Sequence, residues 1–250
     1  MFYTIHLKLI RLFLSCFLFV LAAAAAVLLI SERQELALAV PAVSERGGVP
    51  TLILDPGHGG EDGGAVSPNG LVESLVNWEI VRRLEALADF FGLDSVKTRE
   101  SEAIEYPDAA RTTASRKGWD TRSRVELVNS VPDAVLISVH QNKYPTAGPC
   151  GALVLYGAGE ESKALAELTH ANLLQGLDPT NRRVAAPVPR GVYMFKNIGC
   201  TAILAECGFL SNPREEALLL TDTYRLKVAV LLMGSCLQYY GTVWGDTNEI

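Results

Sequence analysis

The sequence predicts an α/β domain built on a largely parallel sheet that helices cover on both sides. Residues 51–55, 134–139 and 201–205 are short, continuous apolar runs without a polar face, which is typical of strands buried on both faces. Segments with helical periodicity separate these runs, as in α/β proteins. A polar side chain stands at the end of each run, and ligands of such sheets bind outside the carboxyl ends of the strands.

The remaining elements follow from spacing and from stop signals. Apolar residues recur at helical intervals after residue 74, and Gly92 is a suitable helix end. The pair Asn212-Pro213 has the form of an N-cap followed by proline at the first helical position. The predicted helices span 74–91, 121–130, 162–174 and 224–240, the further strands span 95–98 and 152–156, and loops span 100–118, 141–151 and 178–190.

The N-terminus predicts a membrane element. Lys8 and Arg11 precede an apolar run over residues 12–30, and roughly 18–20 such residues span a bilayer core. Basic residues before the run and Glu32 after it favour a cytoplasmic N-terminus and an exported body. We favour a retained anchor because the run is longer than a usual signal core. The small residues at 22–26 keep a cleaved signal peptide as the alternative.

Composition limits the function classes. The chain has 250 residues, of which 49% are hydrophobic and 20% charged, so one globular domain is expected after the N-terminal segment. Its net charge of −6 argues against general nucleic-acid binding. The expected organisation is an anchor or signal over 1–31, a tether over 32–49, the main domain over 50–241 and a tail over 242–250.

The cysteines of the main domain leave two interpretations open. They lack a CxxC pair and a tight spacing, although an exported domain can form disulfides. Buried free thiols and a bridge therefore both remain. The four residues are Cys150, Cys200, Cys207 and Cys236.

Two histidines at equivalent strand ends predict a metal site. His58 lies within Asp55-Pro56-Gly57-His58-Gly59-Gly60 after the first strand, and His140 follows the run at 134–139. Catalytic zinc uses about three protein ligands and one open position. Glu73, at the start of a helix, is the best third ligand, with Glu61 and Asp62 as competitors.

The third strand end carries Glu206, to which we assign proton transfer. Partial burial at this position would raise the pKa of its carboxyl group towards a useful range. The alternative is a carboxylate satisfied by backbone N–H groups or by an arginine. His170 lies in a helical segment without a partner, and is expected to be a surface or packing residue. His6 precedes the membrane run and is not a ligand.

These residues form motifs that resemble the zinc-dependent N-acetylmuramoyl-L-alanine amidases of bacterial cell walls. The resemblance covers residues 51 to about 240. The motifs are Asp55-Pro56-Gly57-His58-Gly59-Gly60, Gly70-Leu71-Val72-Glu73, Ser138-Val139-His140-Gln141-Asn142 and Ala205-Glu206-Cys207-Gly208-Phe209-Leu210-Ser211-Asn212.

The resemblance implies a three-layer α/β/α sandwich around a mostly parallel, six-stranded sheet. It implies that His58, Glu73 and His140 bind one Zn²⁺ ion and that Glu206 is catalytic. The substrate would be the amide between N-acetylmuramic acid and L-alanine in peptidoglycan. The layout of a small, anchored, single-domain protein is most similar to spore-cortex amidases, and whether an activator protein takes part stays open.

Other features concern the substrate. Gln141 stands where many relatives have a small residue. Asn142 and Arg124 are expected to contact substrate, although the basic stretch that contains Arg124 also fits a solvated face. Two rival functions remain: a non-catalytic peptidoglycan-binding or regulatory protein on the same fold, and a zinc peptidase acting on the stem peptide.

Overall fold

A six-stranded sheet forms the centre of the computed structural model, which describes residues 48–244. Its strand order is β2-β1-β3-β6-β4-β5. Neighbouring strands are parallel except β4 and β6, which are antiparallel. The predicted mostly parallel sheet is confirmed. The strands are β1 (Thr51–Pro56), β2 (Ser95–Lys97), β3 (Ala134–Asn142), β4 (Leu153–Tyr156), β5 (Ala186–Pro187) and β6 (Thr201–Phe209).

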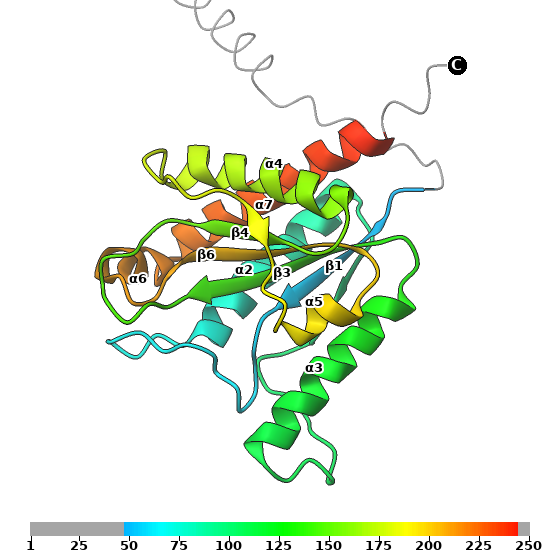
Figure 1. Cartoon of the computed structure of the whole chain (residues 1–250), viewed down its shortest axis with the longest axis vertical. Coiled ribbons are helices and arrows are strands. Elements are labelled where there is room, and N and C mark those ends of the chain that lie inside the picture. The colour runs from blue at the N-terminus through cyan, green and yellow to red at the C-terminus, as the bar shows by residue number, and fades with distance from the viewer. Residues whose placement is uncertain (1–47, 245–250) are drawn as a thin grey trace, which may run out of the picture. The chain divides into compact units, whose positions relative to one another are not determined.

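Helices cover both faces of this sheet (Figure 1). They are α2 (Glu73–Phe91), α3 (Thr113–Ser130), α4 (Glu160–Leu177), α5 (Tyr193–Asn197), α6 (Pro213–Leu219) and α7 (Asp222–Trp244). The alternation of β1 shows the layers: Leu52 and Leu54 enter the core shared with α2, α4 and α7, whereas Ile53 enters the smaller core beneath α3 and α5. One face is therefore covered by three long helices, and the other by α3 and the short α5.

The helix predicted over 121–130 begins earlier, at Thr113. The Thr112 side chain accepts a hydrogen bond from the backbone N–H of Ser115, and Ser115 Oγ accepts one from the backbone N–H of Thr112, which completes a capping box. The polar composition of this first half concealed the helix. Two other short elements, β5 and α5, lie in segments where no element was expected.

Not every apolar residue at helical spacing in α2 is buried near the start of the helix. Leu75 is 45% exposed, whereas Val76 and Ile80 are fully buried. The first turn instead buries polar residues, including Glu73 and Asn77. This end of α2 lies under the carboxyl edge of the sheet, where polar groups have polar partners.

The described residues contain one helix, α7, that is long and apolar enough to cross a membrane. Half of that apolar window is buried, and Val228 and Leu232 are fully enclosed in the core shared with α2 and α4. Its hydropathy is therefore explained by packing. The membrane run predicted over 12–30 lies outside the described residues.

The cysteines within residues 48–244 form no disulfide: Cys207 and Cys236 are buried and Cys150 is exposed.

Candidate metal centre and active site

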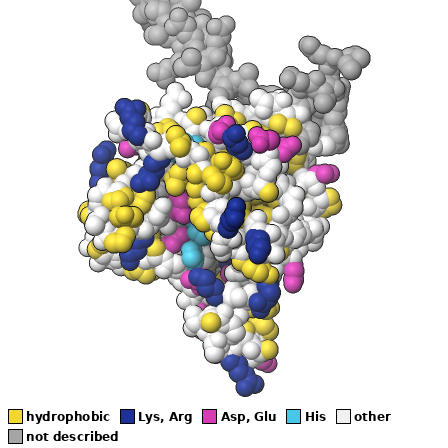
Figure 2. Space-filling view, viewed as in Figure 1, with side chains coloured by type: hydrophobic (Ala, Val, Ile, Leu, Met, Phe, Trp, Pro, Cys, Tyr) yellow, Lys and Arg dark blue, Asp and Glu magenta, His cyan; other side chains and the backbone are white. Residues whose placement is uncertain are grey.

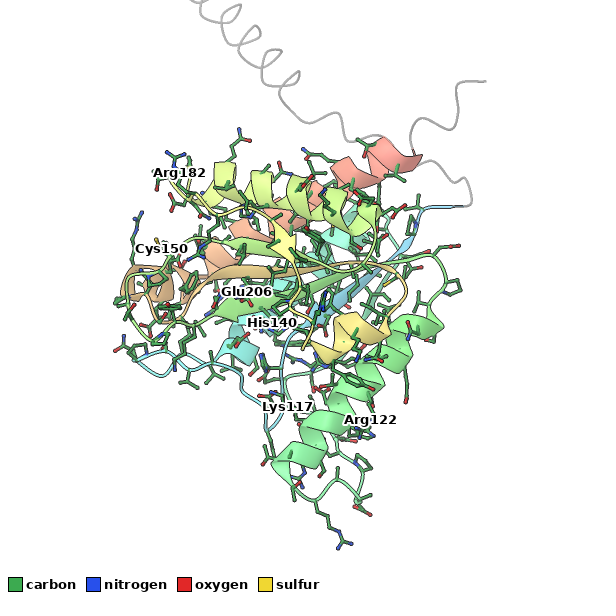
Figure 3. All side chains as sticks on the ribbon, viewed as in Figure 1. Lys117, Arg122, His140, Cys150, Arg182 and Glu206 are labelled. Carbon is green, nitrogen blue, oxygen red and sulfur yellow. The ribbon has the colours of Figure 1, made fainter. Side chains whose placement is uncertain are left out.

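The alternation of β3 and β6 places two site residues on the more open face of the sheet. His140 shares its side of β3 with Leu136, and Glu206 shares its side of β6 with Ala202, both of which face α3 and α5. The two site residues are register partners on adjacent strands. The strands continue to Asn142 and Phe209. His140 and Glu206 therefore lie inside the ends of β3 and β6, whereas the prediction had them directly after the strands. Figure 3 shows both near the same sheet edge.

Three residues meet at this edge in an arrangement that can hold a metal ion. One ligand atom from each of His58, Glu73 and His140 lies within 4.8 Å of the others. Among residues 48–244, this is the cluster of histidine, cysteine or acidic side chains that could hold a metal ion. Glu73 Oε1 is 3.4 Å from His58 Nε2 and 3.0 Å from His140 Nδ1. The two imidazole rings meet edge to face. In Figure 2, histidine and acidic side chains are visible together near the middle of this face.

Asp62 orients the imidazole ring of His58 through Nδ1, the ring nitrogen that faces away from Glu73. His58 Nδ1 lies 3.0 Å from Asp62 Oδ2, and Lys117 Nζ lies 2.8 Å from the same oxygen. Burial alone would lower the pKa of His58, but Asp62 and Glu73 raise that pKa to about 9. A carboxylate behind a ligating histidine fixes its tautomer and ring orientation. Asp62, weighed above as a ligand, therefore has an orienting position, and Glu61 pairs with Arg116 instead.

Glu73 is a buried carboxylate surrounded by donors. Its Oε2 accepts the backbone N–H of Ala65 at 2.8 Å, and its Oε1 accepts that of Gln141 at 3.1 Å. Burial would raise the pKa of Glu73, but His140 and His58 outweigh this effect and lower it well below the usual range. The carboxylate is thus ionised and acceptor-only, as a metal ligand requires.

Arg124 supports the loop that carries His58. Its guanidinium donates to Asp55 Oδ1 at 2.7 Å and to the carbonyl of His58 at 2.6 Å. It also pairs with Asp120. His58 has a φ of 61°, an uncommon conformation outside glycine, and these contacts hold it there.

The expected substrate contact by Arg124 finds no support in this position. The side chain is 5% exposed, and its donors are engaged within the protein. The sequence showed a basic stretch but could not show that Arg124 is the buried member of it.

Glu206 differs from Glu73 in that its buried oxygen has no hydrogen-bond partner within the described part of the chain. Part of its side chain reaches the surface, but Oε2 is buried and has no hydrogen-bond partner among the described residues. Burial raises the pKa of Glu206 to about 7. The alternative stated above, a Glu206 carboxylate satisfied by backbone N–H groups or by an arginine, does not agree with this unpaired oxygen.

The other predicted residues lie as follows. Asn142 ends β3 beside Phe209 of β6, half-buried, and its carbonyl accepts the N–H of Leu210. His170 is buried, with Nε2 2.8 Å from the carbonyl of Arg183, so it packs in the domain.

The sequence analysis missed one residue near the site, the fully buried Asn77. Its position one helical turn after Glu73 was the available signal.

Comparison with known proteins decides the family. The sequence profile described as N-acetylmuramoyl-L-alanine amidase matches residues 52–235. The chain belongs to this family. The predicted activity, hydrolysis of the amide between N-acetylmuramic acid and L-alanine in cell-wall peptidoglycan, is confirmed at the level of family membership.

Individual relatives agree with this assignment. A germination-specific N-acetylmuramoyl-L-alanine amidase of Bacillus subtilis is 36% identical over 199 residues, which is 79% of this chain and 82% of the relative. The CwlD amidase of Clostridioides difficile, solved in complex with the GerS lipoprotein, is 29% identical with a TM-score of 0.74, covering 78% of this chain and all of that one. AmiC2 of Nostoc punctiforme is 25% identical with a TM-score of 0.65, over 77% and 97% of the two chains.

Proposed function

We propose that this amidase uses one zinc ion held by His58, Glu73 and His140, with Glu206 as the proton-transfer residue. The observation that carries the proposal is the contrast within one site: three converging ligand atoms beside a carboxylate that has no partner. A binding protein has no need of that buried, unpaired oxygen, which is costly to maintain.

The residues fit a metal by their chemistry and by the space around them. Two imidazoles and one carboxylate form a donor set of catalytic zinc sites. Glycines leave room for this set: a Cβ at Gly57 would lie 2.3 Å from the ring of His140, and one at Gly64 would lie 2.6 Å from Glu73 Oε2. The same donors also suit non-haem iron, so elemental analysis of the purified protein is part of the test.

Glu206 carries out the proton transfers. A bound zinc ion supplies Lewis-acid chemistry, which polarises a carbonyl and makes water more acidic. The Glu206 carboxylate accepts a proton from the attacking water and then donates it to the nitrogen of the departing L-alanine. In the metal-free protein, burial raises the pKa of Glu206 to about 7, so this carboxylate is a stronger base than an exposed one, as proton transfer requires.

Substrate contact and cellular setting complete the proposal. Asn142 orients the substrate in this proposal, and its partial exposure at the strand end next to the site supports that role. The domain acts outside the cytoplasm, held at the membrane by the apolar run over 12–30. Its similarity to a germination-specific amidase supports a role at the spore cortex. The similar CwlD amidase was solved in complex with the GerS lipoprotein, which supports a lipoprotein as a partner of this chain too.

Digestion of purified peptidoglycan tests the function, with mass spectrometry of the products. We expect free stem peptides that begin at L-alanine, released roughly 10²–10⁴-fold more slowly by the Glu206→Gln variant. Shortened stems still attached to glycan would indicate a peptidase, and intact stems with retained wall binding would indicate a binding protein. Either result would overturn the proposal.

A further inference from the structure

We propose that Asn77 and Gln141 form a positioning pair that fixes the Glu73 carboxylate and the loop leading to His58, and so sets the metal affinity of the site. This inference rests on the proposed function. It concerns two neutral amides that touch neither the reacting atoms nor the solvent, and that join three separate segments beneath the ligands.

Asn77 lies at the junction of these segments. It is fully buried on α2, one turn after Glu73. Its Nδ2 donates to the carbonyl of Gly57 at 3.0 Å and lies 3.4 Å from Glu73 Oε1. Gly57 directly precedes His58. One amide group thus contacts the carboxylate ligand and the backbone that carries a histidine ligand.

Gln141 fixes the orientation of that amide. Strand alternation directs its neighbour His140 to the open face and Gln141 to the face covered by α2. Gln141 is 3% exposed, and its Nε2 donates to Asn77 Oδ1 at 3.2 Å. Because Oδ1 accepts this bond, the two Nδ2 protons of Asn77 must point towards Gly57 and Glu73.

Stability alone does not account for Gln141. Its Oε1 is buried and has no hydrogen-bond partner among the described residues. A buried amide that is only partly satisfied contributes less to stability than an apolar side chain of the same shape. The hydrogen bond that the Gln141 side-chain amide donates goes to Asn77, and through it to the ligand set.

Neutral amides are the suitable chemistry for this position. Glu73 must remain ionised between two imidazoles, and a second carboxylate at position 77 would repel it. A lysine there would compete with the metal for Glu73. An amide supplies a donor without a charge, and residues behind metal ligands typically change metal affinity 10–100-fold when they are removed.

The experiment measures zinc affinity by competition with a chromophoric chelator in the full-length protein. Gln141→Met preserves side-chain length and the backbone N–H that Glu73 accepts. We expect zinc affinity to fall about 3–10-fold in Gln141→Met and about 10–100-fold in Asn77→Leu. The double variant should bind no more weakly than Asn77→Leu alone, because Gln141 acts through Asn77.

Ser162→Ala is the matched control. Ser162 is also fully buried and makes two hydrogen bonds, to Ala158 and Ala202, away from the ligands. Its loss should lower the urea midpoint of the metal-free protein and leave zinc affinity unchanged. Crystal structures of the parent and Gln141→Met, both metal-free, should show a displaced Asn77 amide or Glu73 carboxylate in the variant.

The outcomes separate this inference from the proposed function. Parental zinc affinity in a folded Gln141→Met protein, or equal and additive losses in the two single variants, would overturn the positioning pair alone. If Asn77→Leu fails to fold, Gln141→Met and its crystal structure decide the matter. A parent protein that binds no zinc would overturn the proposed function, and the pair with it.

Discussion

The first turn of α2 and the end of β6 each present a glutamate to the same site, yet their environments are opposite. Glu73 accepts N–H groups from Ala65 and Gln141 and lies against two imidazoles, which lower the pKa of its carboxyl group. Glu206 has a buried oxygen without a donor, and burial raises the pKa of its carboxyl group to about 7. The difference teaches that donor supply, more than burial, separates a ligand carboxylate from a proton-transfer carboxylate.

The same chemical change at the two glutamates should have different consequences, and the larger one is expected at Glu73. Glu73→Gln should reduce zinc affinity more than 100-fold and activity to background, because it removes a ligand and its charge. His140→Ala should do the same. Equilibrium dialysis with metal analysis, alongside muropeptide hydrolysis, measures both effects. Retention of stoichiometric zinc by either variant would show that the ligand set is wrong.

At the end of β6, Glu206→Gln should lower kcat roughly 10²–10⁴-fold while zinc content stays at the parental level. The amide is isosteric but cannot accept a proton. Steady-state kinetics on purified muropeptides, with metal analysis of the same sample, gives the answer. Normal turnover would remove Glu206 from the mechanism, and loss of zinc would make it a ligand like Glu73.

Asp62 offers a smaller test on the Glu73 side of the comparison. Asp62→Asn removes the charge behind His58 Nδ1, and we expect zinc affinity to fall about 10–100-fold. The pKa of His58 in the metal-free protein should also fall from about 9, which NMR titration can follow. Glu61→Gln is the matched control on the same loop, since Glu61 pairs with Arg116 and not with a ligand. Equal effects of the two changes would mean that only loop stability matters.

Sequence reasoning succeeded where a pattern is local and failed where a contact is distant. The apolar run at 134–139 and the glycines around His58 mark strand ends, and the topology then brings the ligands together. The buried ion pair of Arg124 with Asp55 joins residues 69 positions apart. Its existence depends on how α3 packs, which composition does not reveal. Gln141 was noticed only as an unusual neighbour of His140, because strand register decides that it faces α2.

The smallest expected effect concerns folding stability, and it follows from the raised pKa of Glu206. In the metal-free native protein this carboxyl group keeps its proton up to about pH 7, whereas in the unfolded chain it ionises near its ordinary value of 4.5. The unfolded state therefore gains stability from ionisation between these values, and native stability falls as pH rises from about 4.5 to 7. Glu206→Gln removes this loss.

Urea unfolding after chelator treatment should find the Glu206→Gln variant more stable than the parent by about 3 kcal/mol at pH 8 and nearly equal to it at pH 4.5. The His58 contribution is common to both proteins and largely cancels in the difference. Glu73→Gln should have the opposite sign, because a carboxylate with a lowered pKa stabilises the native state once it is ionised. Its deficit relative to the parent should shrink as pH falls. If both variants shift stability in the same direction at pH 8, the two glutamates do not differ in the way that their hydrogen bonds indicate.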